Sequence, residues 1–465
     1  MNPNDLINLG NDTICAVSTP QGRGGIAVIR VSGPQALDIV QQRWQGMPLT
    51  DMKTHTVHLG QLLDSKSEIL DQAILTIYRA PNSFTGEDVV ELACHGSTWI
   101  QQQAIQTLID AGCRHATAGE FTRRAFANGR LDLSQAEAVA DVIEAQSRAA
   151  HHVAMSQMRG RYSDELHGLR DKLLHFVALI ELELDFSEED VTFADRSEVT
   201  ALAHEIHALI SRLADSYSEG NAIRNGVPVA IVGQTNAGKS TLLNALLRDD
   251  RALVSNIHGT TRDTIEDTVI MGGTLFRFID TAGIRQSSDA VERMGIERTW
   301  QAIDKSSIVL WVVDVTSADI SMADDILGRC EGKRLIAVLN KTDLDDDVAA
   351  RSELSGLLPE GTPVMAISAK SETDIETLRS LIVDTVSLPE VNSDAVFVTN
   401  ARHYQALTRA RDAIARAIDG LDSGLSGDLL DQDIRECLHW LGEITGEITT
   451  DNILGEIFAH FCIGK

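Results

Sequence analysis

Residues 233–240, Gly-Gln-Thr-Asn-Ala-Gly-Lys-Ser, have the residue types and the spacing of a phosphate-binding loop. The apolar run 229–232 before the loop predicts a buried strand, and the leucine spacing after it predicts a helix. Glycines allow backbone N–H groups to turn toward phosphate oxygens, and a helix N-terminus adds partial positive charge. We therefore expect Lys239 to contact the β- and γ-phosphates of a nucleotide and the Ser240 hydroxyl to ligate Mg²⁺.

Two later motifs indicate which base the nucleotide carries. Asn340, Lys341 and Asp343 follow the apolar run 336–339, and Ser368 and Ala369 follow the run 364–367. The Asp343 carboxylate can accept hydrogen bonds from the two N–H donors of guanine, which adenine lacks. The motifs therefore predict a GTP site in which Ser368 and Ala369 lie against the base.

Two connecting segments between the loop and Asn340 are expected near the γ-phosphate. Residues 259–263, Gly-Thr-Thr-Arg-Asp, contain Thr261, which could complete the Mg²⁺ shell once GTP is bound. Residues 280–283, Asp-Thr-Ala-Gly, form the D-x-x-G motif that senses the γ-phosphate. Five motifs in this order predict a GTP-binding domain.

The residue after D-x-x-G is unusual for a Ras-like hydrolase. A glutamine that orients water is expected there, but the residue is Ile284, and no catalytic arginine is evident. Either hydrolysis is very slow or another group and another cation act instead. Glu292 is a candidate carboxylate, and the side-chain oxygen of Asn236 could hold a monovalent cation near the phosphates.

Composition limits the classes of function that this chain can have. Its 465 residues include 43% hydrophobic and 23% charged residues, no apolar run approaches the ~20 residues of a membrane span, and no export signal is visible. Six cysteines without C-x-x-C spacing fit a reducing cytoplasm. The net charge of −28 repels nucleic acid, so an RNA contact needs local basic patches. Arg123, Arg124, Arg402 and Arg409 could supply such contacts, although a solvated helix face is the simpler interpretation.

The hydrophobic pattern changes along the chain and predicts a multidomain fold of α+β and α/β parts. Residues 1–118 contain short β-rich runs and glycine-rich turns, whereas 119–220 and 389–465 have helical periodicity. Residues 134–137, Ser-Gln-Ala-Glu, match a capping box. We expect an N-terminal α+β domain, a helical bundle formed by 119–220 with 389–465, and an inserted Ras-like P-loop G domain at 221–388.

Motifs along the whole chain resemble the tRNA-modification GTPase family MnmE, also called TrmE. The motifs are Gly22-Arg-Gly-Gly25, Asn82-Ser-Phe-Thr-Gly-Glu-Asp88, Leu131-Asp-Leu-Ser-Gln-Ala-Glu137, Asn236-Ala-Gly-Lys-Ser240, Gly259-Thr-Thr-Arg-Asp263, Ile284 and the terminal Phe461-Cys-Ile-Gly-Lys465. The resemblance implies that residues 1–118 bind a folate and mediate homodimerisation. It also implies a flavin-dependent partner, MnmG. With MnmG, such a protein adds an aminomethyl or carboxymethylaminomethyl group to the wobble uridine of certain tRNAs, using methylene-tetrahydrofolate.

The resemblance also implies the site residues. K⁺ would be held by Asn236, Ser255, Ile257 and Thr260, and Mg²⁺ by Ser240 and Thr261. Glu292 would be the general base acting through water, with Lys239 and Asn236 also catalytic. A 5-formyl- or methylene-tetrahydrofolate would contact Arg30, Glu91, Arg130 and Lys465, and Cys462 would be a thiol near the modification site. The expected GTP contacts are Asn236, Ala237, Gly238, Lys239, Ser240, Thr241, Ser255, Asn256, Ile257, His258, Gly259, Thr260, Thr261, Asp280, Thr281, Ala282, Gly283, Asn340, Lys341, Asp343, Ser368 and Ala369.

A different function stays open at this point. GTPases that act as switches in ribosome assembly share Asn-x-Gly-Lys-Ser and an apolar residue after D-x-x-G. That alternative predicts an appended basic RNA-binding domain, against which the net charge of −28 counts. We therefore expect a cytoplasmic GTP hydrolase that takes part in tRNA modification.

Overall fold

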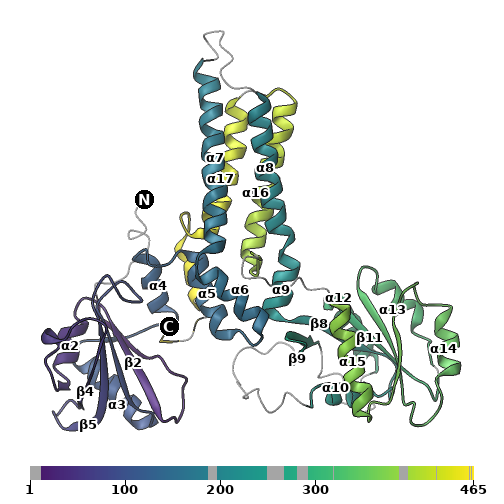
Figure 1. Ribbon diagram of the computed structural model, residues 1–465, viewed down its shortest axis with the longest axis horizontal. Helices are drawn as coiled ribbons and strands as arrows, with labels where there is room; N and C mark the ends of the chain where they lie inside the picture. Colours follow the sequence, from purple (N-terminus) through teal and green to yellow (C-terminus); the bar gives the residue numbers. More distant parts are fainter. Residues whose placement is uncertain are drawn as a thin grey trace. The chain divides into compact units, whose positions relative to one another are not determined.

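The computed structural model describes residues 12–186, 196–248, 266–279, 292–317, 319–386, 396–425, 427–459, 461 and 463–464. The chain divides into two compact units (Figure 1). The first unit contains Met1–Glu144, Ala154–Ala214 and Arg402–Lys465, and the second contains Ala145–Val153 and Asp215–Ala401. Both units are discontinuous in sequence, so each is described separately.

The first unit contains a mixed sheet and most of the long helices. Its elements, wholly or mainly, are β1 (Ile14–Val17), β2 (Ile26–Ser32), α2 (Ala36–Gln41), β3 (Trp44–Gln45), the 3₁₀ turn η1 (Leu49–Asp51), β4 (Thr56–Leu63), β5 (Ile69–Tyr78), β6 (Val89–His95), α3 (Thr98–Asp110), β7 (Arg114–His115), α4 (Glu120–Ala127), α5 (Leu133–Glu144), α7 (Arg161–Phe186), α8 (Arg196–Asp215), α16 (Ala401–Asp422), α17 (Gly427–Thr445) and α18 (Asp451–Ala459). Helix α6 (Arg148–Met158) runs from the second unit into the first.

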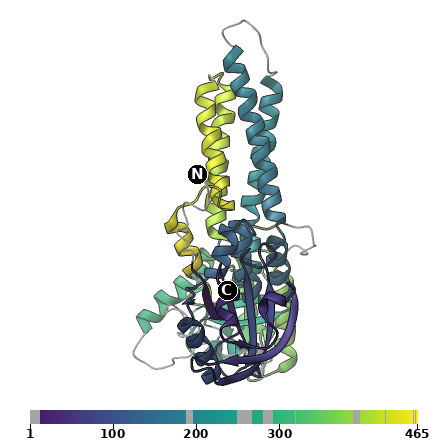
Figure 2. The same ribbon diagram turned by 90° about the vertical axis from the view of Figure 1, so that its left-hand side faces the viewer.

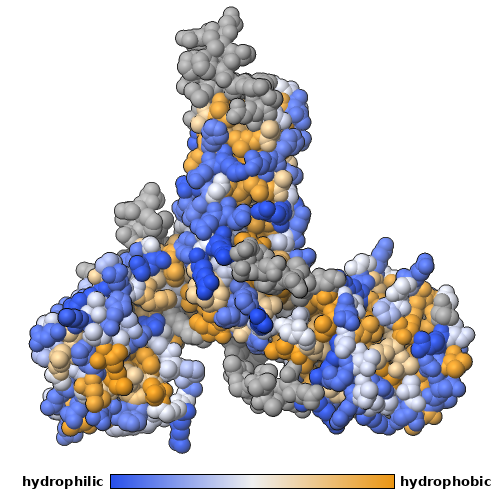
Figure 3. Space-filling model, in the orientation of Figure 1, coloured by the Kyte–Doolittle hydropathy of each residue, from blue (hydrophilic) through white to orange (hydrophobic). Residues whose placement is uncertain are grey.

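The sheet of the first unit has the order β3-β4-β5-β6-β2-β1-β7 and is antiparallel except for the β1–β7 pair. Alternate residues of β2, among them Ile29 and Val31, pack in one core with α2 and α3. Val57, Leu59 and Ile74 on the neighbouring strands β4 and β5 are 63%, 67% and 44% exposed. Apolar surface is visible over this sheet-containing part of the molecule (Figure 3).

Four long helices, α7, α8, α16 and α17, lie side by side as a bundle (Figures 1 and 2). Their buried residues recur every three or four positions, as the sequence predicted. Examples are Leu166, Leu169 and Leu173 on α7 and Ile206 and Ile210 on α8, all at most 2% exposed.

The N-terminus of α5 corrects the predicted capping box. Ser134 and Glu137 do not form it; instead the Asp132 carboxylate accepts from the Gln135 amide at 2.9 Å, and the Gln135 side chain accepts from the Asp132 amide at 3.0 Å. The reciprocal pair therefore begins two residues earlier, because Ser134 is buried and hydrogen-bonded to Ser163.

The second unit is an α/β domain with a six-stranded sheet. Its elements are α9 (Tyr217–Asn225), β8 (Val227–Val232), α10 (Lys239–Leu246), β9 (Asp267–Met271), β10 (Thr274–Phe278), α12 (Glu292–Lys305), β11 (Ile308–Asp314), α13 (Ala323–Arg329), β12 (Arg334–Asn340), α14 (Val348–Ser355), β13 (Val364–Ile367) and α15 (Glu372–Thr385).

The strand order of this sheet is β13-β12-β11-β8-β10-β9, and only the β9–β10 pair is antiparallel. Two apolar clusters cover its faces, one with α10 and α15 and the other with α12, α13 and α14. The central strands β8, β11 and β12 are buried on both sides, which explains their nearly continuous apolar sequences. The carboxyl ends of β8, β12 and β13 meet at one edge, where open α/β sheets bind their ligands.

Candidate functional site

The phosphate-binding loop connects β8 to α10 and holds a lysine inside its curve. Lys239 is the first residue of α10, and its Nζ donates to the carbonyl oxygens of Gly233 and Gln234 at 2.8 and 2.7 Å. Burial lowers the pKa of Lys239. Two loop carbonyls therefore hold the ammonium group. A bound phosphate would compete with these carbonyls for the ammonium group.

Two glycines of this loop cannot be replaced without moving their neighbours. A Cβ on Gly233 would lie 2.1 Å from the Val312 carbonyl oxygen, and one on Gly238 would lie 2.1 Å from Nδ2 of Asn340. Both have positive φ angles, as has Asn236 at +64°. The loop consequently presents its backbone in the left-handed conformations that anion-binding concavities use.

The base-recognition residues form a connected network beside the loop. Asn340 is 1% exposed; its Nδ2 donates to the Ala237 carbonyl at 2.8 Å and its Oδ1 accepts from the Ala369 amide at 3.0 Å. Asp343 accepts from Lys370 Nζ and from the Ser368 hydroxyl, both at 2.9 Å. These hydrogen bonds hold the pKa of Asp343 below its usual range, so the acceptor that guanine requires is ionised and oriented.

Asp314 and Ser321 were not among the predicted residues of this edge. Asp314 accepts from Lys341, whose φ is +72°, at 2.5 Å, and the Ser321 hydroxyl accepts from Gln234 of the phosphate loop at 2.7 Å. Asp314 is the last residue of the buried strand β11. An acidic residue directly after an apolar run was the available signal, because strand ends in this sheet lie at the ligand edge.

Several predicted nucleotide contacts lie outside the described residues. They are Ser255, Asn256, Ile257, His258, Gly259, Thr260, Thr261, Asp280, Thr281, Ala282 and Gly283. Ser240 and Thr241 lie in the first turn of α10, and Glu292 is the first residue of α12. The described part of the site therefore comprises the loop, Ser240, Thr241 and the base-recognition network.

A second candidate site lies in the first unit and joins three of the predicted folate contacts. Arg30 and Glu91 face each other on β2 and β6, and the arginine Nε and Nη2 donate to one carboxylate oxygen at 2.9 and 2.8 Å. The other oxygen accepts from the Tyr78 hydroxyl at 3.4 Å. Burial raises the pKa of Tyr78, and the Glu91 charge raises it further. Tyr78 and Arg130, which come from different segments of the chain, both line one cleft.

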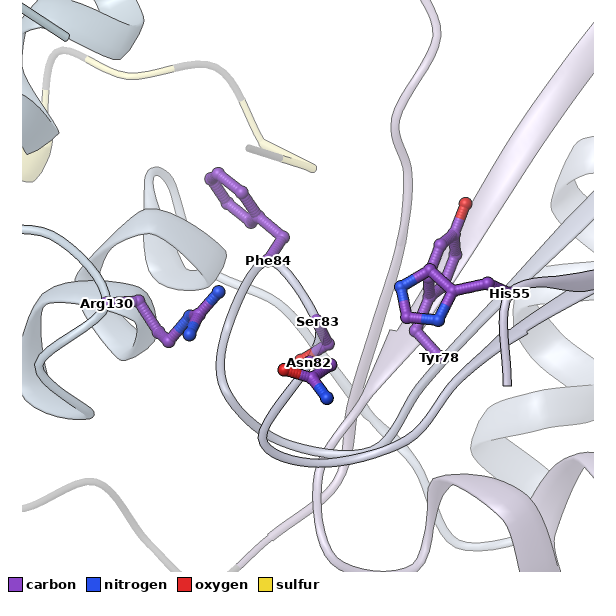
Figure 4. Close-up of a pocket in the computed structure, with 6 residues that line it drawn as sticks. All are labelled: His55, Tyr78, Asn82, Ser83, Phe84 and Arg130. Atoms are coloured by element: carbon purple, nitrogen blue, oxygen red, sulfur yellow. The ribbon is translucent and has the colours of Figure 1, made fainter. Parts of the chain in front are cut away.

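This cleft has a volume of about 430 Å³ and is lined by His55, Tyr78, Asn82, Ser83, Phe84 and Arg130 (Figure 4). Phe84 also packs under the Arg30 guanidinium, 5.4 Å from the ring centroid. The cleft therefore combines aromatic faces with one cation, a lining that suits a flat heteroaromatic ligand with an anionic end. His55 and Tyr78 were not predicted, because nothing in their local sequence indicates a common cleft, and the 82–84 segment was noted only as part of the motif at 82–88.

The C-terminal segment returns to the same part of the first unit. Ile463 pairs with Ala118 in an isolated β-bridge, and the Gly464 carbonyl accepts from the Ser18 hydroxyl at 3.0 Å. Phe461 packs in a cluster with Phe126. Cys462 and Lys465 lie outside the described residues, but their described neighbours contact the N-terminal part of the chain.

Two arginines considered for tRNA phosphates are held in ion pairs instead. Arg124 is 1% exposed and contacts Asp12, Glu87 and Glu120 at 2.7, 3.0 and 3.2 Å. Arg402 pairs with Glu137 at 3.1 Å. Neither side chain is free in solvent, because Asp12 and Glu87 hold Arg124 and Glu137 holds Arg402, and these carboxylates come from distant parts of the sequence.

The surroundings of the Glu137 and Glu120 carboxylates favour the charged state of both groups. Burial raises the pKa of Glu137, but His403 and Arg402 lower it more, to about 2. Burial likewise raises the pKa of Glu120, while hydrogen bonds from Arg114 and the Thr117 amide bring it to about 2.

Comparison with known proteins gives the family. A model of the MnmE helical domain matches residues 133–462, and a model of the N-terminus of the GTP-binding protein TrmE matches residues 13–130. The tRNA modification GTPase MnmE of Bacteroides thetaiotaomicron is 53% identical over 468 residues, which cover 98% of this chain and all of the relative. That of Parabacteroides distasonis is also 53% identical, over 97% of this chain and all of the relative.

The chain belongs to the MnmE family of tRNA modification GTPases.

MnmE membership makes the activity a GTP hydrolysis that takes part in tRNA modification. The predicted family is confirmed, and the comparisons do not support the alternative of a GTPase switch in ribosome assembly. The G domain of the T. maritima FeoB iron transporter is 25% identical over 34% of this chain and 98% of its own, but the TM-score of 0.25 is too low to carry an argument. None of the described helices has the length and apolar composition of a membrane crossing.

Proposed function

We propose that this MnmE family member uses K⁺-stimulated GTP hydrolysis, together with the flavin-dependent protein MnmG, to modify the wobble uridine of certain tRNAs. It adds an aminomethyl or carboxymethylaminomethyl group, whose one-carbon unit comes from methylene-tetrahydrofolate. The reaction takes place in the cytoplasm, with tRNA. The observation that carries the proposal is that one chain of this family has both a GTP-type loop and a separate cleft beside Arg30, Glu91 and Arg130.

The domain organisation of the proposal has four segments. Residues 1–118 form the folate-binding and dimerisation domain, and 221–388 form the G domain. Residues 119–220 and 389–465 together form the helical domain. The discontinuous composition of both compact units supports an inserted G domain.

The nucleotide site suits the two proposed cations. Asn236 and Ser240 are oxygen donors on the phosphate loop and the first turn of α10, and hard cations prefer oxygen ligands. Mg²⁺ would be held by Ser240 and Thr261, and K⁺ by Asn236 with Ser255, Ile257 and Thr260. Bound there, the cations would supply positive charge beside the phosphate oxygens, the role that an arginine has in other GTPases.

The protein groups have separate roles in hydrolysis. Lys239 exchanges its two loop carbonyls for the β- and γ-phosphates of GTP. Asp343 orients the guanine, and Asn340 connects the phosphate loop to the base-binding segment by hydrogen bonds to both. Glu292 acts as the general base through a water molecule. Because Ile284 cannot orient water, hydrolysis depends on groups outside the D-x-x-G motif.

The folate cleft and the exposed sheet face support the remaining parts of the proposal. Arg130 is the cation for the glutamate end of the folate, and the Arg30–Glu91 pair borders its ring end. Lys465 and Cys462 complete the site from the C-terminus. The directly paired Leu59 and Ile74 are both exposed, an apolar surface that a second copy of the chain would cover in a homodimer.

The experiment that tests the proposal analyses tRNA nucleosides. Cells without this protein are supplied with the wild-type chain, Asn236→Ala or Arg130→Ala, and their tRNA is digested for mass spectrometry. We expect the modified wobble uridine with the wild-type chain and its loss with either variant. In parallel, GTP hydrolysis by the wild-type chain should be faster in K⁺ than in Na⁺. If the modified wobble uridine were still present in cells that lack the protein, or if the hydrolysis rates were equal in both salts, the proposal would be contradicted.

A further inference from the structure

We propose that His55 is a ligand-contacting residue that determines specificity in the cleft opposite Arg130. The proposal rests on the folate function proposed above and adds the group that recognises the flat end of the ligand. It assigns the His55 ring to one wall of the cleft, where it contacts a planar heteroaromatic group such as a reduced pterin.

The backbone of His55 is the first observation. His55 has φ of +62°, and the other non-glycine residues with positive φ in the described part of the chain are Ser67, Asn236 and Lys341. Asn236 and Lys341 belong to the nucleotide site. Ser67 lies in a hairpin turn where the Asp64 carboxylate accepts from two backbone amides. Left-handed conformations of residues other than glycine cost free energy and concentrate at functional sites, and His55 lines the cleft.

The His55 ring is held on two sides. Its Nδ1 lies 2.9 Å from the Thr54 hydroxyl, which already accepts from the Arg79 amide at 3.0 Å. The hydroxyl proton can therefore be donated to Nδ1, an arrangement in which the neutral ring carries its proton on Nε2. The ring also meets Tyr78 edge to face, with centroids 5.4 Å apart and planes at 89°.

These contacts connect His55 with the predicted folate residues. Tyr78 donates to Glu91, and Glu91 accepts from Arg30. Figure 4 shows the His55 and Tyr78 rings together on one side of the cleft and Arg130 on the other. A ligand lying between them would meet ring faces and an N–H donor at one end and a guanidinium at the other. A flat heteroaromatic group linked to a carboxylate has this pattern.

The test measures binding of 5-formyl-tetrahydrofolate to the full chain by calorimetry, together with the melting temperature. His55→Gly removes the ring and also relieves the positive φ, and His55→Asn keeps a residue that tolerates this φ but has no ring. Ser67→Gly is the matched control, because it relieves the same backbone conformation outside the cleft. We expect both His55 variants to bind at least tenfold more weakly while their melting temperatures stay within a few degrees of the wild-type chain, and Ser67→Gly to bind normally.

The outcomes separate the two proposals. Wild-type affinity in His55→Gly and His55→Asn, with weakened binding in Arg130→Ala, would overturn the role of His55 and leave the folate function standing. Absence of saturable folate binding by the wild-type chain would overturn both. Weaker binding only in variants whose melting temperature also falls would assign His55 a structural role and contradict the inference.

Discussion

The nucleotide site and the folate cleft are built in different ways. At the nucleotide site, each functional group comes from a short motif at the end of a parallel strand, so the sheet gathers Lys239, Asn340 and Asp343 at one edge. At the cleft, single residues come from the residue before β4, from β5, from the 82–84 segment and from the turn after α4, and Arg30 on β2 and Glu91 on β6 connect to it through Tyr78. One site is encoded in runs of sequence and the other only in the tertiary structure.

The interactions that stabilise the two sites also differ. The nucleotide loop is stabilised by backbone hydrogen bonds and by Asn340. The segment that lines the cleft is anchored by a half-buried carboxylate, Glu87, which accepts from the buried Ser32 at 2.6 Å and from the buried Arg124 at 3.0 Å. A change in the buried charges should therefore affect the first unit and the cleft and leave GTP binding unchanged.

The largest expected effect is that of Arg124→Met. The substitution removes the buried guanidinium from Glu87 and Glu120, but Glu120 keeps its hydrogen bonds from Arg114 and the Thr117 amide. We therefore expect a loss of about 3 kcal/mol, the lower end of the cost of breaking a buried pair. Denaturant unfolding measures this loss. The control is Arg123→Met on the same helix, since Arg123 lies 4.0 Å from Glu120 and is 33% exposed, which predicts a loss of about 1 kcal/mol or less. Equal stability of the two variants would show that the buried network does not support this unit.

The next effect is a dependence of stability on pH. The pKa of Glu120 is lowered from 4.5 to about 2. A lowered folded-state pKa stabilises the protein above the unfolded value, here by about 3 kcal/mol, and this contribution is lost as the pH falls from about 4.5 toward 2. The difference in unfolding free energy between the wild-type chain and Glu120→Gln should therefore be largest above pH 5 and shrink toward pH 2.5. If the difference in unfolding free energy did not depend on pH, the lowered pKa of Glu120 would be contradicted.

A smaller effect is expected for Asp343→Asn, and it is confined to the nucleotide. An amide cannot accept both guanine N–H donors, so the affinity for GTP should fall about a hundredfold, and xanthosine triphosphate should bind better than GTP. Asp345→Asn, at an exposed carboxylate two residues away, is the control and should bind GTP normally. Folate binding and stability should not change in either variant. A loss of folate binding in Asp343→Asn would show that the two sites are coupled rather than separate.

The predictability of each region follows from these differences. The run 364–367 is a strand with those same limits, and the predicted strand before Asn340 is found, because continuous apolar sequences are typical of a sheet buried on both faces. Arg124 could not be interpreted correctly, since its burial depends on Asp12 and Glu87, which are 112 and 37 residues away in sequence. His55 gave no signal because its role depends on the neighbouring strand that carries Tyr78. Asp132 took the capping role because burial of Ser134 left that serine unable to perform it.

The most direct test of the account measures both ligands on the same full-length variants. Calorimetry with GTP and with 5-formyl-tetrahydrofolate would compare the wild-type chain, Asp343→Asn and Arg130→Ala. We predict that the wild-type chain binds both ligands, that Asp343→Asn binds only the folate tightly, and that Arg130→Ala binds only GTP tightly. If the wild-type chain bound only one ligand, or if either variant lost both, the claim of two separate sites in one chain would be contradicted.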